Sequence, residues 1–203
     1  MLTIFSRNGF NKPLALVSLL LSALLLNGCS SSSTPDSAYS DSSADRVSLK
    51  KGQRLSLVIA EDHPVGAEAR EQYLSNVFPL AESYGYATNH IFKIEKTLIG
   101  SDIPQAFGIY SWPDAESAKK LRSSSTYKED YAPLQQQGWS ELKLIESDIK
   151  NTIDFQVNKD KFYTVARGWL GNEQSYKEYL DGTSALREEL QSNILFDLPI
   201  DFY

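Results

Sequence analysis

The stretch Gln105-Ala-Phe-Gly-Ile-Tyr-Ser-Trp112, followed at once by Pro113-Asp114-Ala115-Glu116-Ser117-Ala118, decides the expected fold. Residues 105–112 are mainly apolar and aromatic, which is typical of a strand in a sheet. Asp114 is a preferred helix N-cap, because its carboxylate can accept a hydrogen bond from a free N–H group of the first helical turn. The stretch therefore predicts a strand that leads directly into a helix.

The flanking segments extend this pair into a larger unit. Pro79 interrupts the helical spacing upstream and Gly85 ends it, while a turn at 100–102 joins two strands into a hairpin. Pro133 breaks the helical stretch downstream. The predicted elements are, in order, a strand over 55–61, a helix over 67–84, a strand over 90–97, the strand over 105–112, a helix from 115, a broken helix over 126–137 and a strand over 139–146.

This β-α-β-β-α-β order predicts an α+β fold of the ferredoxin-like split βαβ type. In that arrangement the helices cover one face of a single antiparallel sheet. The other face is then left for a partner or a ligand.

Several short motifs in this region resemble the DUF1330 family of the dimeric α+β barrel superfamily. The resemblance covers about residues 54–147 and implies the fold, whereas the function of the family is largely unassigned. The superfamily includes cofactor-free monooxygenases, haem-degrading enzymes and binding modules. The haem-degrading relatives hold iron with a histidine on the helix of the second half, and residues 115–137 contain none. The motifs are Tyr73-Leu74, Pro79, Tyr84-Gly85, residues 112–118 and residues 124–127.

The remainder of the chain, residues 149–203, begins the same pattern again. Strands are predicted over 153–157 and 162–170, a helix over 173–191 and a last strand over 194–202. Tyr179-Leu180 repeats the earlier pair Tyr73-Leu74 at the same point. We therefore predict a partial internal repeat that supplies one βαβ half of a second unit. Such a half packs on the first unit or is completed by a second chain.

The N-terminal residues 1–28 have the character of a targeting segment. Arg7 and Lys12 precede an uncharged stretch over 13–26, which is shorter than the ~20 residues that a membrane-spanning helix needs. The sequence Leu26-Asn27-Gly28-Cys29 then resembles the lipobox of bacterial lipoproteins. The resemblance implies cleavage before Cys29, the only cysteine of the chain, and attachment of lipid to it. Ser30 in the next position favours the outer membrane over the inner one.

A Ser-rich segment separates Cys29 from the predicted domain. Residues 30–43 contain eight serines, and such a composition cannot bury enough apolar surface to order itself. We predict a flexible tether over 29–48 and a domain over 49–148. Loss of residues 1–28 would remove Arg7 and Lys12 and no acid, so the net charge would change from −6 to −8. This acidic balance argues against a nucleic-acid partner.

Few residues point to chemistry. His90 shares a strand face with Phe92 and Ile94, and Tyr110 and Trp112 lie on the next strand beside the small Ala106 and Gly108. These residues are the candidate pocket, because small residues beside large ones can leave a cavity for an apolar ligand. Ordinary core packing is the alternative. No cluster has the spacing of metal ligands, and we name no catalytic residue and no cofactor.

The sequence therefore predicts a lipid-anchored envelope protein with a binding or assembly module that is not catalytic. Its partners are the membrane, through the lipid on Cys29, and a second copy or another envelope protein. The alternative is a cofactor-independent enzyme, similar to the monooxygenases of the superfamily, in which His90, Tyr110 and Trp112 line the pocket. The two hypotheses differ in whether an enclosed cavity forms at these three residues.

Overall fold

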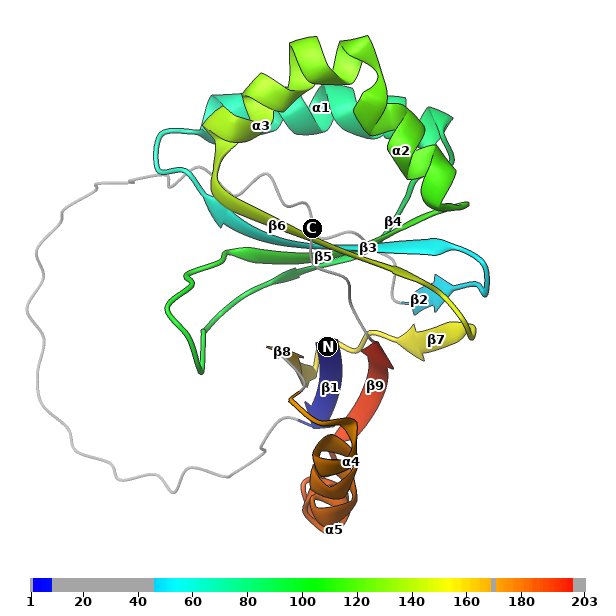
Figure 1. Cartoon of the computed structure of the whole chain (residues 1–203). Coiled ribbons are helices and arrows are strands. Elements are labelled where there is room, and N and C mark those ends of the chain that lie inside the picture. Colours follow the sequence, from blue (N-terminus) through cyan, green and yellow to red (C-terminus); the bar gives the residue numbers. More distant parts are fainter. Residues whose placement is uncertain (1, 9–45, 169–170, 199–203) are drawn as a thin grey trace, which may run out of the picture.

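The computed structural model describes residues 2–8, 46–168 and 171–198 (Figure 1). The lipidation site Cys29, the apolar stretch over 13–26 and most of the predicted tether lie outside these residues, so they remain predictions. Within the described ranges, no helix has both the length and the apolar character to cross a membrane.

A four-stranded antiparallel sheet with the order β4-β5-β3-β6 forms the centre of the protein. The inner strand β5 is buried at every residue, as its mainly apolar composition predicts. The second predicted strand begins and ends earlier than expected, because Ala87 already pairs with Ser111, whereas the apolar alternation begins only at His90. The strands are β3 (Arg54–Asp62), β4 (Ala87–Lys93), β5 (Ala106–Trp112) and β6 (Trp139–Asp148).

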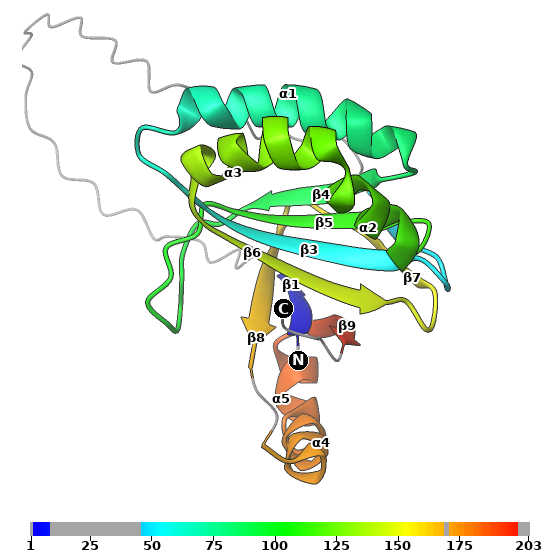
Figure 2. The same ribbon diagram turned by 45° about the horizontal axis from the view of Figure 1, so that its top comes forward.

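Helices cover one face of this sheet (Figure 2). The predicted cap is confirmed, since Asp114 Oδ1 accepts a hydrogen bond of 2.7 Å from the backbone N–H of Ser117. Gly85 follows the first helix with φ +84°, and a Cβ there would lie 2.4 Å from the Pro113 ring, so glycine is required on both counts. The elements are α1 (Ala67–Ser83), α2 (Ala115–Ser123), the π-helical turn η1 (Tyr127–Tyr131) and α3 (Ala132–Gly138).

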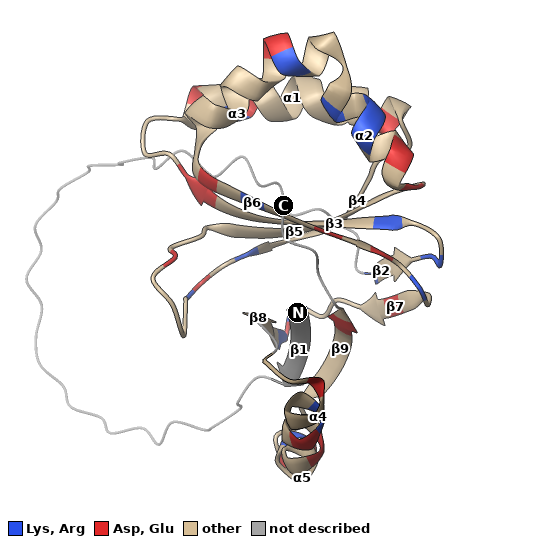
Figure 3. Cartoon of the chain, in the orientation of Figure 1, with Lys and Arg blue, Asp and Glu red and all other residues tan. Residues whose placement is uncertain are grey.

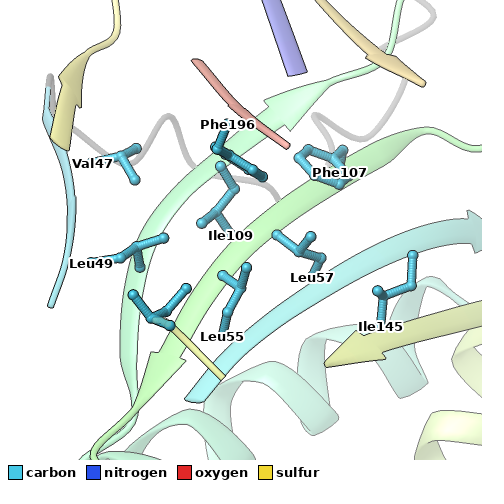
Figure 4. Close-up of a cluster of buried hydrophobic side chains, with 9 residues drawn as sticks. Val47, Leu49, Leu55, Leu57, Phe107, Ile109, Ile145 and Phe196 are labelled. Carbon is cyan, nitrogen blue, oxygen red and sulfur yellow. The ribbon is translucent and has the colours of Figure 1, made fainter. Parts of the chain in front are cut away.

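The chain itself packs on the opposite face of the sheet. Strands β2 (Arg46–Leu49) and β7 (Ile153–Gln156) pair with each other, and their apolar side chains join those of the sheet. Figure 4 shows Phe196, from the C-terminal part, in this cluster together with Phe107 and Ile109. This face, expected to be left for a partner or ligand, is therefore covered in part by the chain's own residues.

The start of the domain needs a correction. The tether was expected to extend to residue 48, but residues 46–49 form strand β2, in which Val47 and Leu49 are fully buried. Two apolar residues at alternate positions are enough to attach this short strand to the core, although the serines before them indicate a tether.

A second, three-stranded sheet has the order β8-β1-β9 and lies on the side away from α1 to α3 (Figures 1 and 2). Its strands are β8 (Lys161–Arg167), β1 (Leu2–Asn8) and β9 (Asn193–Leu198). The single helix expected over 173–191 is two helices, α4 (Glu173–Gly182) and α5 (Ser184–Glu189), which meet at Thr183. In these two helices Tyr179 and Leu186 are 59% and 53% exposed.

The fold is therefore α+β, with antiparallel sheets and helices, as predicted. The order strand, helix, two strands, helices, strand over residues 54–148 agrees with the expected one. The internal repeat stays a prediction, although β8, α4, α5 and β9 follow one another as a strand, helices and a strand.

Candidate functional site

The three residues of the predicted pocket lie on opposite faces of the sheet. Tyr110 and Trp112 point toward the helices, where Trp112 packs with Ala81 of α1. His90 pairs in register with Ile109, a residue of the cluster on the other face. Its ring contacts Phe92, with 4.4 Å between the ring centroids. The structure therefore brings Tyr110 and Trp112 together but not His90.

The cavity expected beside Gly108 is filled by Tyr110 itself. A Cβ built on Gly108 would lie 2.3 Å from the Tyr110 ring, so the ring occupies the space that the missing side chain leaves. Tyr86 stacks on the same ring, with 5.2 Å between centroids and 19° between planes. The small residue thus accommodates a packed aromatic layer and not a ligand, and this set of residues does not support the enzyme alternative.

A groove with a volume of about 1000 Å³ runs between helix α2 and the edge strand β6. We call it the β6 groove. Six of its lining residues are cationic and two are acidic, although the chain as a whole has a net charge of −6. Figure 3 shows Lys and Arg residues in blue along the ribbon of α2 and at the start of β3. The cationic residues are Arg54, Lys119, Arg122, Lys128, Lys143 and Arg167, and the acidic ones are Glu141 and Glu146.

A buried carboxylate organises one wall of the β6 groove. Glu146 is 6% exposed and accepts hydrogen bonds from Arg122 Nη2 at 2.9 Å on both carboxylate oxygens. Ser56 Oγ donates to Glu146 Oε1 at 2.9 Å, and the Trp112 indole N–H donates to Ser56 Oγ at 3.0 Å. Arg54 lies 3.7 Å away as a further cation. These bonds hold the Arg122 guanidinium in place at the groove wall.

On the other side of β6, ion pairs hold Lys143 and Arg167. Lys143 Nζ contacts Asp102 at 2.5 Å and Glu141 at 2.9 Å, and Arg167 lies 3.4 Å from the same Asp102 carboxylate. The hydrogen bond from Lys143 lowers the pKa of Asp102 below its ordinary value. Because Arg167 belongs to β8, this cluster also connects the second sheet to the edge of the first.

Two lysines complete the groove and remain available to a ligand. Lys119 on α2 and Lys128 in η1 are exposed, and neither makes an ion pair with the described residues. Together with the half-exposed Arg122, they present cationic groups to any molecule in the groove. This arrangement suits the binding of a carboxylate or phosphate group.

The β6 groove was not among the sites predicted from the sequence. The only available signal was the polar Arg54 and Ser56 at alternate positions of an otherwise apolar strand. Such residues indicate a buried polar network on one sheet face, but they do not identify the partner, since Glu146 follows 90 residues after Ser56.

No protein-family model and no curated protein sequence matches the chain. Two solved structures are similar to part of it. The crystal structure of the methylated RPA0582 protein is 20% identical with a TM-score of 0.45, over 49% of this chain and 82% of that one. The crystal structure of RPA0582 from Rhodopseudomonas palustris, described as a protein of unknown function, is 20% identical with a TM-score of 0.44, over 49% and 83%. Similarity at this level says nothing about an activity or a ligand.

Proposed function

We propose that this chain is a lipid-anchored envelope protein whose domain binds an anionic group in the β6 groove, without catalysing a reaction on it. The observation that carries the binding function is the gathering of six cationic side chains around one groove of an acidic protein. The ligand is a molecule or a partner surface that presents carboxylate or phosphate groups.

The lipid anchor rests on the resemblance of residues 26–29 to a lipobox and on the absence of any second cysteine. A single cysteine in an exported protein has no disulfide partner in its own chain, and lipidation gives it a role. Each buried CH₂ of an acyl chain contributes about 0.8 kcal/mol, so several chains would hold the protein firmly. Ser30 favours the outer membrane over the inner one.

The proposed architecture is the ferredoxin-like unit of the dimeric α+β barrel superfamily. It is supported by the order β4-β5-β3-β6 and by the helices on one face of that sheet. Strand β9 contributes Phe196 to the other face, which is consistent with a C-terminal half that packs on the first unit and mimics part of the superfamily's dimer.

The binding function is tested by titrating pyrophosphate, as a simple anionic probe, into the purified protein in a calorimeter. The double variant Lys119→Ala/Lys128→Ala should bind about tenfold more weakly, since two exposed charges contribute roughly 0.5–1 kcal/mol each. Lys50→Ala/Lys51→Ala removes the same charge from exposed positions outside the groove and is the matched control. Equal weakening by both double variants would show that only net charge matters.

The anchor is tested separately by labelling cells with palmitate. The wild-type protein should incorporate the label and migrate as the cleaved form, whereas Cys29→Ala should keep its leader and carry no label. Fractionation of the envelope then distinguishes the outer from the inner membrane. Equal label in the variant would refute the anchor.

A further inference from the structure

Strand β1 occupies the middle of the second sheet and is antiparallel to both of its neighbours. Residues 2–8 pair with all seven residues of β8, from Leu2 opposite Arg167 to Asn8 opposite Lys161. Five of them also pair with β9, from Leu2 opposite Leu198 to Ser6 opposite Asn193. Strands β8 and β9 are therefore parallel to each other and separated by one strand (Figure 1).

The first unit contains the same arrangement. There β5 lies between β3 and β4, which are joined by α1, just as β1 lies between β8 and β9, which are joined by α4 and α5. In the first unit the middle strand comes next in the chain after the strand-helix-strand segment. In the second unit it comes from the opposite end of the chain, so the C-terminal segment does not supply it.

The proposed lipid anchor removes this middle strand, and the present inference rests on that part of the proposed function. Residues 2–8 lie within the segment cleaved before Cys29. They also precede the apolar stretch, and the positive start of a leader stays on the cytoplasmic side of the membrane while the domain is exported. The mature protein then has two strand edges that face each other across the width of one strand, roughly 10 Å.

Facing edges of this kind are an acceptor site, because each carries a row of backbone N–H and C=O groups that need partners. We infer that the mature protein takes an extended segment of another polypeptide between β8 and β9, as a middle strand antiparallel to both. Every backbone group of such a strand can bond to one neighbour or the other. We call this position the strand seat.

The side chains of β8 and β9 define the chemistry of the incoming segment. Val165 and Phe196 face the core of the first sheet, and Tyr163 contacts Phe92 with 5.1 Å between centroids. On the other face Phe162 is 61% exposed, and Thr164 is exposed as well. The segment should therefore be six or seven residues long, with apolar residues at alternate positions, including the position opposite Val165, and polar residues between them.

The described strands of a second copy do not fit the seat. Strands β2 to β7 of a second copy are each hydrogen-bonded to a neighbour along at least one edge, whereas a strand in the seat needs both edges free. Strands β8 and β9 of a second copy form the two sides of its own seat. An extended segment of a different envelope protein meets this requirement. A second copy, and closure of β8 directly onto β9 as a parallel pair, are distinct outcomes of the test.

The test uses the mature lipoprotein, purified in detergent, and the Cys29→Ala precursor, which keeps residues 2–8. The probe is a fluorescent peptide with the sequence of residues 2–8, the segment that the structure places in the seat. The mature protein should bind it, and the precursor at least tenfold more weakly, because its own residues fill the seat. A peptide with Ile4→Pro should also bind at least tenfold more weakly, because a middle strand uses every N–H and proline has none. A scrambled peptide controls for composition.

Hydrogen exchange of β8 and β9 amides decides the remaining alternatives. Amides of both strands should exchange fast in the mature protein and become protected when the peptide is added. Protection without peptide in a monomer would mean that the gap has closed, and a dimer that excludes the peptide would mean that a second copy fills it. Either result, or failure of the mature protein to bind, would overturn the strand seat. The mass of the purified protein separates this from failure of the anchor: a retained leader refutes the anchor and leaves the seat filled in the same chain.

Discussion

The most informative perturbation is the loss of the Glu146 carboxylate. Glu146 accepts three hydrogen bonds, two from Arg122 and one from Ser56, and lies beside the buried Arg54. Bonds to charged groups contribute about 1.5–3 kcal/mol each but do not add. Removing one member of a buried ion pair lowers stability by about 3–5 kcal/mol, since the other charge stays buried. Arg122 is 32% exposed and can reach water. We therefore expect Glu146→Ala to lower the free energy of unfolding by about 3 kcal/mol, the lower end of this range.

The measurement is urea unfolding, followed by tryptophan fluorescence, with the midpoint and slope fitted for each variant. Glu146→Gln should lower the free energy of unfolding by less, about 1–2 kcal/mol, because the glutamine amide oxygen can still accept a hydrogen bond from Ser56. The control is Asp154→Ala, which breaks a pair with Arg46 that is shorter, 2.5 Å, but whose arginine side chain is 70% exposed. Solvent screens an exposed pair, so Asp154→Ala should lower the free energy of unfolding clearly less than Glu146→Ala. If Glu146→Ala and Asp154→Ala lowered the free energy of unfolding equally, burial would not be the reason for the contribution of the Glu146 network to stability.

Three further variants test other parts of the structure. Gly108→Ala should displace the Tyr110 ring and lower the free energy of unfolding by about 1–3 kcal/mol, with a changed near-ultraviolet circular dichroism spectrum; an unchanged spectrum would contradict the packed ring. Phe196→Ala should lose about 3–5 kcal/mol in urea unfolding, and a loss below about 1 kcal/mol would show that the second sheet does not share the core. Lys143→Met should raise the pKa of Asp102 toward its ordinary value in an NMR titration, which an unmoved pKa would contradict. In the wild type, the pKa of Asp102 is lower in the folded protein than in the unfolded protein. The Asp102 carboxylate therefore stabilises the fold at pH values above its pKa in the unfolded protein. This contribution is lost as the pH falls through its pKa in the folded protein.

The local elements of the first unit were predictable because short-range physics determines them. The Asp114 cap needs only the three residues that follow it, and Gly85 ends α1 at a positive φ that other residues avoid. Strand β5 is mainly apolar and aromatic, so its burial was also expected. The π-helical turn η1 and the break at Thr183 were missed, because small shifts in helical hydrogen bonding leave little trace in apolar periodicity.

The candidate site was predicted incorrectly because it depends on which sheet face each strand presents. The residues Tyr110 and Trp112 were read correctly as neighbours, since alternate residues of one strand share a face. His90 was placed with them, but the register of β4 against β5 puts it opposite Ile109, on the other face. A shift of one residue in register moves a side chain across the sheet, and the pattern of a single strand does not contain that information.

The sequence by itself determined the order of elements over residues 54–148, the cap of α2, and the motif at Cys29 that motivates the proposed anchor. These follow from residues close together in the chain, for which sterics and local hydrogen bonds are sufficient. Only the tertiary structure decided the pairing of Glu146 with Arg122 and Ser56, the filling of the Gly108 space by Tyr110, and the strand between β8 and β9. The physical reason is that contacts between distant residues depend on how the sheets are paired and packed, and many pairings are compatible with the same local pattern.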